Sequence, residues 1–212
     1  MADIIREIPG AVGPLEALVD RPAGEPRAAV VFAHPLPTEG GTMHTKVVFQ
    51  GAKALSRIGC VVLRFNFRGV GRSAGAWDNG RGEMDDYRAA LDFAAAQYPG
   101  LELWAAGFSF GSYIAATCGA GDDRVCTLIG IAPPVDRYDY GVVKRSMKPK
   151  FIIHGERDEL IPLRAVREFY AQLQEPKELV EIDRANHLFD GQASEVGDAL
   201  EELLTDFSCR TQ

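Results

Sequence analysis

Residues 101–112, which read LELWAAGFSFGS, decide the fold. Leu101–Phe108 is a short apolar run with aromatic residues, typical of a buried strand, and a helical pattern begins at Gly111. Between the two lies GFSFG at 107–111, which matches G-x-S-x-G. A serine in a sharp turn from strand to helix has a strained backbone and tolerates only small residues two positions away. This context predicts that the Ser109 hydroxyl projects at the carboxyl edge of a sheet.

The rest of the chain alternates short apolar runs with longer segments of helical period. The further predicted strands are Ala28–Ala33, Cys60–Phe67, Val125–Ile131, Phe151–His154 and Leu179–Ile182. The predicted helices are Thr45–Ile58, Glu83–Gln97, Gly111–Ala120, Leu163–Leu173 and Ser194–Phe207. Near-continuous apolar runs indicate strands buried on both sides, so we predict an α/β fold with a mostly parallel central sheet and helices on both faces. The span Ile4–Val19, which proline and glycine interrupt, is compatible with one or two antiparallel edge strands.

Length and composition restrict the class of protein. The 212 residues are 46% hydrophobic and 25% charged, as in ordinary globular proteins, and contain no repeat or linker, so we expect one domain over 1–212. The formal net charge of -7 repels phosphate backbones and anionic lipid, so we expect no nucleic-acid or membrane partner. No stretch approaches the roughly 18 apolar residues of a membrane span, and no signal-peptide pattern is visible.

The four cysteines are Cys60, Cys118, Cys126 and Cys209. They are too sparse for a disulfide scaffold, and no two of them form a C-x-x-C pair. Their number and spacing predict a reducing compartment and no structural zinc. Together with the missing signal pattern, this makes a cytoplasmic protein the expectation.

A serine hydroxyl needs a base to take its proton, and the base needs a third group to orient it. Asp158 follows a predicted strand in HGERDELIP, and His187 follows the last predicted strand in DRANHLFDG. Both positions lie just beyond strand carboxyl ends, where open parallel sheets build their sites. The order Ser109, Asp158, His187 is the one that an α/β-hydrolase arrangement requires.

With these motifs the chain resembles the α/β-hydrolase superfamily, and within it the small, lidless, dienelactone-hydrolase-like serine hydrolases. The resemblance rests on the blocks AHPLPTEGGTMHTKVV (33–48), RFNFRGVGRSAG (64–75), AGFSFGS (106–112), HGERDELIP (154–162) and NHLF (186–189). It implies a catalytic triad of Ser109, Asp158 and His187. It also implies an oxyanion hole made by the backbone N–H groups of Leu36 and Phe110, and no metal or organic cofactor.

Other residues have competing interpretations. We expect His34 and His154 to shape or cap their turns, and Arg68 and Arg72 to hold a loop by ion pairing. Asp136 and Asp139, which follow the predicted strand Val125–Ile131, are alternatives to Asp158, because some relatives place the acid after that strand. The pattern G-x-G-x-x-A at 69–74 mimics a dinucleotide fingerprint, but glycine-rich sequence follows it where a helix is needed, so we expect a loop.

The candidate substrate contacts are His44, Trp77, Tyr138 and Phe189.

The segment between the strand Val125–Ile131 and Phe151 is too short for a lid domain. An uncovered site favours small soluble carboxylic esters over long-chain lipids, with an acyl-enzyme intermediate. Thioester, peptide or perhydrolase chemistry on the same triad stays open, as does a non-catalytic binding protein on this fold. The expected partner is a small-molecule ester, and the sequence leaves monomer and homodimer equally open.

Overall fold

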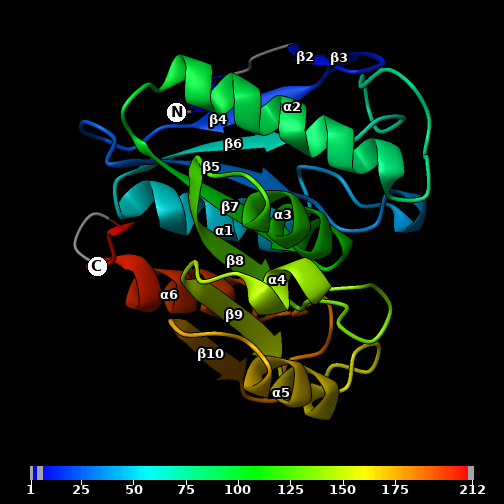
Figure 1. Cartoon of the computed structure of the whole chain (residues 1–212), viewed down its shortest axis with the longest axis vertical. Helices are drawn as coiled ribbons and strands as arrows, with labels where there is room; N and C mark the ends of the chain where they lie inside the picture. The colour runs from blue at the N-terminus through cyan, green and yellow to red at the C-terminus, as the bar shows by residue number, and fades with distance from the viewer. Residues whose placement is uncertain (1, 4–6, 210–212) are drawn as a thin grey trace.

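The computed structural model describes residues 2–3 and 7–209, and its centre is an eight-stranded sheet (Figure 1). In spatial order the strands are β1 (Ala2–Asp3), β4 (Ala17–Asp20), β6 (Cys60–Phe65), β5 (Ala28–Ala33), β7 (Glu102–Phe108), β8 (Val125–Ile131), β9 (Lys150–Gly155) and β10 (Lys177–Ile182). The strands from β6 to β10 are parallel, whereas β4 runs antiparallel to β6 and β1 antiparallel to β4. The predicted α/β fold with a mostly parallel sheet is confirmed.

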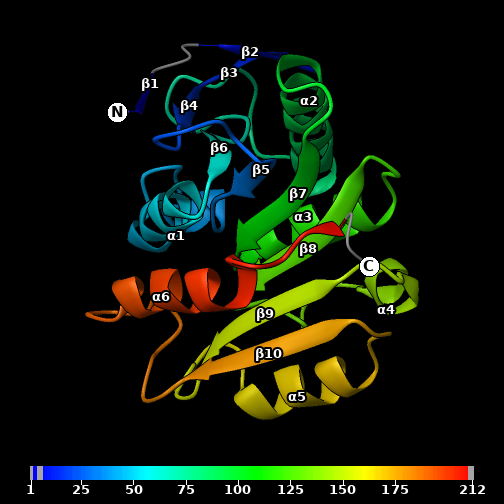
Figure 2. The same cartoon turned by 90° about the vertical axis from the view of Figure 1, so that its left-hand side faces the viewer.

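Helices cover both faces of the sheet (Figure 2). One face carries α1 (Lys46–Arg57) and α6 (Ala193–Leu204), and the other carries α2 (Arg81–Gln97), α3 (Phe110–Ala120), α4 (Gly141–Arg145) and α5 (Leu163–Ala171). Side chains of β5 alternate between the two cores, since Val31 packs with α2 and α3 whereas Val30 packs with α1 and α6. Both side chains are fully buried, which explains why the strand reads as an unbroken apolar run.

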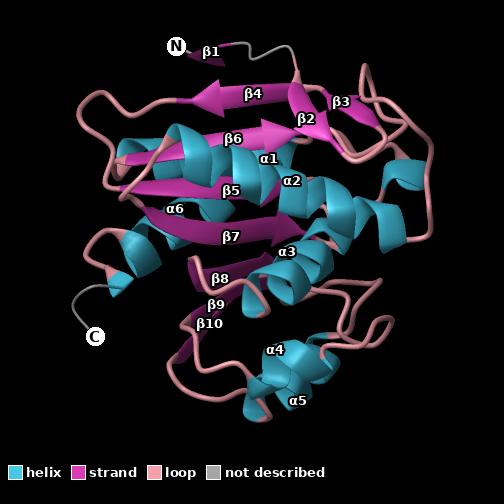
Figure 3. Cartoon of the chain, turned by 45° about the horizontal axis from the view of Figure 1, so that its top comes forward, coloured by secondary structure: helices cyan, strands magenta, loops and turns pink. Residues whose placement is uncertain are grey.

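The predicted elements match the observed ones to within a few residues at each end. The hairpin of β2 (Ile8–Gly10) and β3 (Gly13–Leu15) lies inside the span Ile4–Val19 that was expected to form antiparallel strands, but it makes a separate small sheet instead of an edge of the main one (Figure 3). The 3-10 turn η1 (Pro37–Glu39), the short helix α4 and the two-residue strand β1 were not predicted. These elements are too short to show a period. Residues 4–6 of the predicted edge-strand span lie outside the described residues, and its end contains β4.

A disulfide joins Cys126 in β8 to Cys209 near the carboxyl end of the chain. The pair is 83 residues apart in sequence, so no local spacing marks it, and the sparse cysteine content did not predict it. Cys60 and Cys118 are free and buried, as small apolar residues are.

The parallel strands deliver their following loops to one edge of the sheet. Ser109 directly follows β7, and the loop that contains Leu36 follows β5. Asp158 comes shortly after β9, and His187 shortly after β10. Between β8 and β9 the chain forms only loops and α4, so no lid domain is inserted there. Within the described part of the chain, no helix is long and apolar enough to cross a membrane.

Candidate active site

Ser109 sits in a strained turn between β7 and α3. Its φ is 50°, a left-handed conformation that costs a non-glycine residue of order 1–3 kcal/mol. Its N–H donates to the Ile131 carbonyl at 2.8 Å, which fixes the turn against β8. A Cβ at Gly107 would collide with the Gly111 carbonyl, and a Cβ at Gly111 would collide with the His34 carbonyl. Both positions therefore require glycine, because neighbouring backbone comes too close to leave room for a side chain.

Three side chains from three loops form a hydrogen-bonded chain at this edge. Ser109 Oγ lies 2.9 Å from His187 Nε2, and His187 Nδ1 lies 2.7 Å from Asp158 Oδ2. A neutral imidazole that donates through Nδ1 to the carboxylate leaves Nε2 free to accept the serine proton. The arrangement has the geometry of a nucleophile, a base and an orienting acid.

The Asp158 carboxylate is buried but held in its charged form. Burial alone raises its pKa, but hydrogen bonds from His187 and from the Ile161 N–H outweigh this and leave the pKa below its usual value. The N–H groups of Leu160 and Ile161 donate to Oδ1 at 2.9 and 2.8 Å. Asp158 is thus ionised when it contacts the imidazole.

The two competing acids lie elsewhere. Asp139 Oδ1 accepts from the Gly141 N–H at 2.7 Å at the start of α4, and Asp136 is exposed beside Arg137. The structure brings Asp158, and neither of these, to the His187 imidazole.

His34 and His154 are both fully buried and bonded to backbone. His34 Nδ1 contacts the Pro35 carbonyl at 2.7 Å, and its Nε2 accepts from the Phe67 N–H at 3.1 Å. Burial lowers the pKa of His34 to about 4, so the ring is neutral near pH 7. His154 Nε2 lies 2.9 Å from the Ile161 carbonyl, in the turn that holds Asp158.

The two expected oxyanion donors are the backbone N–H groups of Phe110, which directly follows Ser109, and of Leu36, which lines the same cavity as Ser109. Phe110 is the first residue of α3, where N–H groups have no partner inside the helix, and Leu36 precedes η1. Within the described residues, neither N–H donates to a backbone acceptor. Leu36 and Ser109 also line the same cavity, so both N–H groups are candidates for binding an oxyanion there.

A cavity of about 440 Å³ opens over Ser109 and His187. Besides these two and Leu36, it is lined by Pro35, Glu39, Pro134, Arg137, Glu159, Leu160, Ile161 and Leu188. Sequence reasoning named none of these eight as a substrate contact. The available signal was adjacency, because positions 159–161 follow Asp158 and position 188 follows His187.

The four residues expected to contact substrate do not line this cavity. His44 is exposed at the start of the α1 region. Trp77 and Tyr138 both pack on Phe110, with ring centroids 5.2 and 5.9 Å away. Phe189 is fully buried against Phe108. The three aromatic residues thus pack on Phe108 and Phe110, the two residues that flank Ser109.

The glycine-rich stretch 69–74 forms turns, and the next helix, α2, begins only at Arg81, so no helix terminus meets a phosphate there. Arg68 forms the expected ion pair, with the buried Asp86 at 2.8 Å. Arg72 instead contacts the loop through its backbone, whose N–H donates to the Glu16 carboxylate at 2.9 Å, while its side chain is exposed. Both contacts hold the loop in place.

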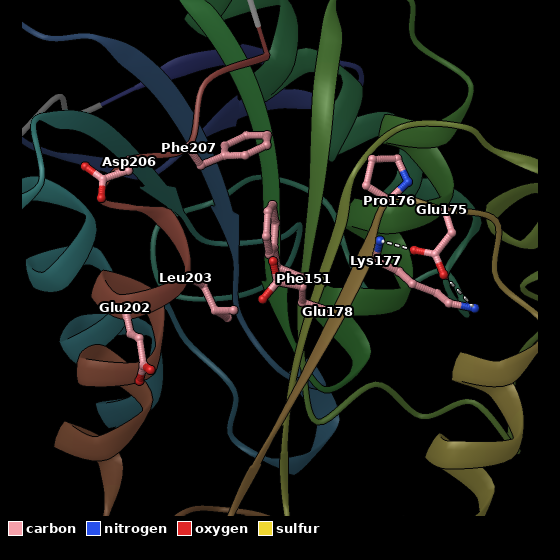
Figure 4. A pocket seen from close by; sticks show the side chains of 9 residues that line it. All are labelled: Phe151, Glu175, Pro176, Lys177, Glu178, Glu202, Leu203, Asp206 and Phe207. Carbon is pink, nitrogen blue, oxygen red and sulfur yellow. Dashed lines mark hydrogen bonds and ion pairs between the residues drawn. The ribbon is translucent and has the colours of Figure 1, made fainter. Parts of the chain in front are cut away.

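A second cavity, of about 320 Å³, lies at the opposite end of the sheet between α6 and the starts of β9 and β10 (Figure 4). It is lined by Phe151, Glu175, Pro176, Lys177, Glu178, Glu202, Leu203, Asp206 and Phe207. The lining contains no serine, cysteine or histidine. It therefore has no serine–histidine pair, in contrast to the cavity at Ser109.

Comparison with known proteins gives consistent matches. The family model of serine aminopeptidase, S33, matches residues 24–148, which include Leu36 and Ser109 but end before Asp158 and His187. An uncharacterised protein of Rickettsia prowazekii (strain Madrid E) is 33% identical over 192 residues, covering 86% of this chain and 81% of that protein.

Two solved structures are similar over nearly their whole length. An α/β serine hydrolase homologue from Coxiella burnetii has a TM-score of 0.89 at 39% identity and covers 96% of this chain and 97% of its own. An α/β serine hydrolase without lid from Xanthomonas campestris has a TM-score of 0.88 at 38% identity and covers 95% and 92%. Like the Xanthomonas structure, this chain has no lid domain between β8 and β9.

Proposed function

This chain belongs to the serine aminopeptidase, S33, family of α/β hydrolases, and from that premise we propose that it hydrolyses small carboxylic esters with Ser109 as nucleophile. The observation that carries the proposal is the chain of contacts at 2.9 Å between Ser109 Oγ and His187 Nε2 and at 2.7 Å between His187 Nδ1 and Asp158 Oδ2. It lies in an uncovered cavity, which suits small soluble substrates better than long lipid chains.

In the proposed first step, His187 Nε2 takes the proton of Ser109 as Oγ attacks the ester carbonyl. The N–H groups of Leu36 and Phe110 stabilise the negative charge on the carbonyl oxygen. His187 then gives its proton to the leaving alcohol, and the acyl group stays on Ser109. A water molecule repeats the attack, and its proton passes through His187 back to Ser109 as the acid leaves. Asp158 stays ionised throughout and stabilises the imidazolium.

Peptide hydrolysis is the second candidate, because the matching family model is that of a serine aminopeptidase. The same nucleophile and base serve both reactions, so substrates must separate them. The cavity wall includes Glu39 and Glu159, carboxylates of the kind that can hold a peptide ammonium group. Aminoacyl nitroanilides and nitrophenyl esters of matched size are therefore assayed side by side.

The test of the proposal is fluorophosphonate labelling followed by intact mass measurement, together with hydrolysis of nitrophenyl acetate. We expect one adduct per chain and ester turnover in the wild type, and neither in Ser109→Ala. His187→Ala should lose nearly all activity, and the double variant little more, since the two groups act as a unit. An unlabelled wild type, or turnover that survives Ser109→Ala, would overturn the proposal. Faster cleavage of the nitroanilides would favour the peptidase.

A further inference from the structure

Two leucines at the mouth of the Ser109 cavity are unusually exposed. Leu160 is 46% and Leu188 53% exposed, although both line the cavity. Within the described residues, the other large hydrophobic side chains with such exposure are Val12, Phe49 and Met147, and none of these lines it. Exposed apolar side chains that gather at one cavity mark a binding surface, whereas single ones carry no such meaning.

The proposed catalytic residues themselves hold the two leucines in place. The Leu160 N–H donates to Asp158 Oδ1 at 2.9 Å, and Leu188 directly follows His187, whose ring contacts the same carboxylate. The His187 N–H also contacts Glu159 Oε2 at 3.3 Å, which ties the two loops together. These contacts hold the backbone that carries the two leucines against the Ser109 site.

The charged side chains of the cavity wall leave this apolar surface uncovered. Arg137 donates to the Leu160 carbonyl at 3.1 Å, and the Glu159 carboxylate accepts from the His187 backbone. Both groups are thus engaged with the loops that carry the leucines. The third charged residue, Glu39, comes from η1, on the loop that contains Leu36.

We propose that Leu160 and Leu188 together bind the uncharged apolar group of the substrate and set its preferred size. The inference rests on the proposed function and names its substrate class, esters with a short to medium apolar group. Each methylene buried between the leucines raises kcat/KM about fourfold, because a buried methylene is worth about 0.8 kcal/mol.

The experiment compares Leu160→Ser, Leu188→Ser and the double variant with the wild type. Met147→Ser is the matched control, because Met147 is 68% exposed and does not line the cavity. One substrate series is nitrophenyl acetate, butyrate and hexanoate, and the other is acetate esters of ethanol, butanol and hexanol. Circular dichroism and thermal melting verify that each variant is folded.

We expect kcat/KM of the wild type to rise with chain length in one of the two series. In the double variant this rise should be about threefold to tenfold smaller, mainly through a higher KM for the longer esters. Met147→Ser should keep both the wild-type ratios and the wild-type rate with nitrophenyl acetate. If the wild type turns over nitrophenyl acetate but the leucine variants show the same dependence of kcat/KM on chain length in both series, the role of the leucines is wrong and the proposed function stands. If the wild type has no Ser109-dependent esterase activity, the proposed function fails with it.

Discussion

His154 Nε2 lies 3.6 Å from Asp158 Oδ2, the same oxygen that contacts His187 Nδ1 at 2.7 Å. The Asp158 carboxylate therefore lies between two imidazoles. His154 also contacts the Ile161 carbonyl at 2.9 Å, while the Ile161 N–H donates to Asp158 at 2.8 Å. Burial lowers the pKa of His154, and a neutral ring protonated on Nε2 can donate to that carbonyl. His154 thus closes the turn that positions the acid.

Replacing His154 tests this positioning role. His154→Phe keeps a ring of similar size but leaves the Ile161 carbonyl without its donor, whereas His154→Gln can still donate. Because one such hydrogen bond is worth about 1 kcal/mol, we expect the phenylalanine variant to lose roughly fivefold in kcat with KM little changed. The glutamine variant should retain most of the activity. Equal kcat values for the two variants in an ester assay would contradict the role of this bond.

The nucleophile turn allows a prediction about Gly111. A Cβ there would meet the carbonyl oxygens of Ala33 and His34, which begin the loop that holds Leu36. We expect Gly111→Ala to lower the free energy of unfolding by roughly 1–3 kcal/mol and to reduce kcat, because the loop must move.

Gly24→Ala is the matched control for this substitution, because a Cβ at Gly24 meets nothing within 4 Å. It should stay within about 0.5 kcal/mol of the wild type in urea unfolding. A Gly111→Ala protein as stable and active as the Gly24→Ala protein would show that the two backbones can separate without cost.

Sequence reasoning found the elements whose signals are local. The strand that ends at Phe108 is apolar from Leu103 onward, and Ser109 follows it between two glycines that the close backbone approach requires. Side-chain direction in loops has no such signal. Phe189 was expected to contact substrate, but its backbone turns at φ 52° and places the ring in the core, while the neighbouring Leu188 faces the cavity. That choice depends on tertiary packing, which no short sequence pattern encodes.

The disulfide between Cys126 and Cys209 ties the carboxyl-terminal segment to β8. It spans 83 residues, and closing a loop of that length in the unfolded chain is worth up to about 4.5 kcal/mol. We expect Cys209→Ser to melt at a lower temperature than the oxidised wild type. In a reducing buffer the two proteins should melt together, because the wild type then lacks the bond as well. A difference that persists under reduction would mean that the Cys209 side chain stabilises the fold in another way.

The buried His34 makes stability dependent on pH. Its pKa falls from 6.5 to about 4 on folding, because burial disfavours the charged ring. Between these values the unfolded chain binds a proton that the folded chain does not, so stability falls as the pH decreases through this window. Above the unfolded pKa the effect is absent. At pH 4 it amounts to about 3 kcal/mol, since each pKa unit is worth about 1.36 kcal/mol.

Urea unfolding at intervals from pH 7.5 to pH 4 isolates this contribution when the wild type is compared with His34→Gln. Glutamine does not titrate, and its side-chain oxygen can accept from the Phe67 N–H as His34 Nε2 does. We expect the variant to be the less stable protein at pH 7.5, where the imidazole makes both of its backbone contacts. The difference in the free energy of unfolding should narrow as the pH falls, because only the wild type must keep the imidazole at position 34 uncharged. His154, whose pKa is also lowered by burial, titrates in both proteins and cancels from the difference. A gap that stays constant over this range would mean that His34 can take up its proton inside the fold.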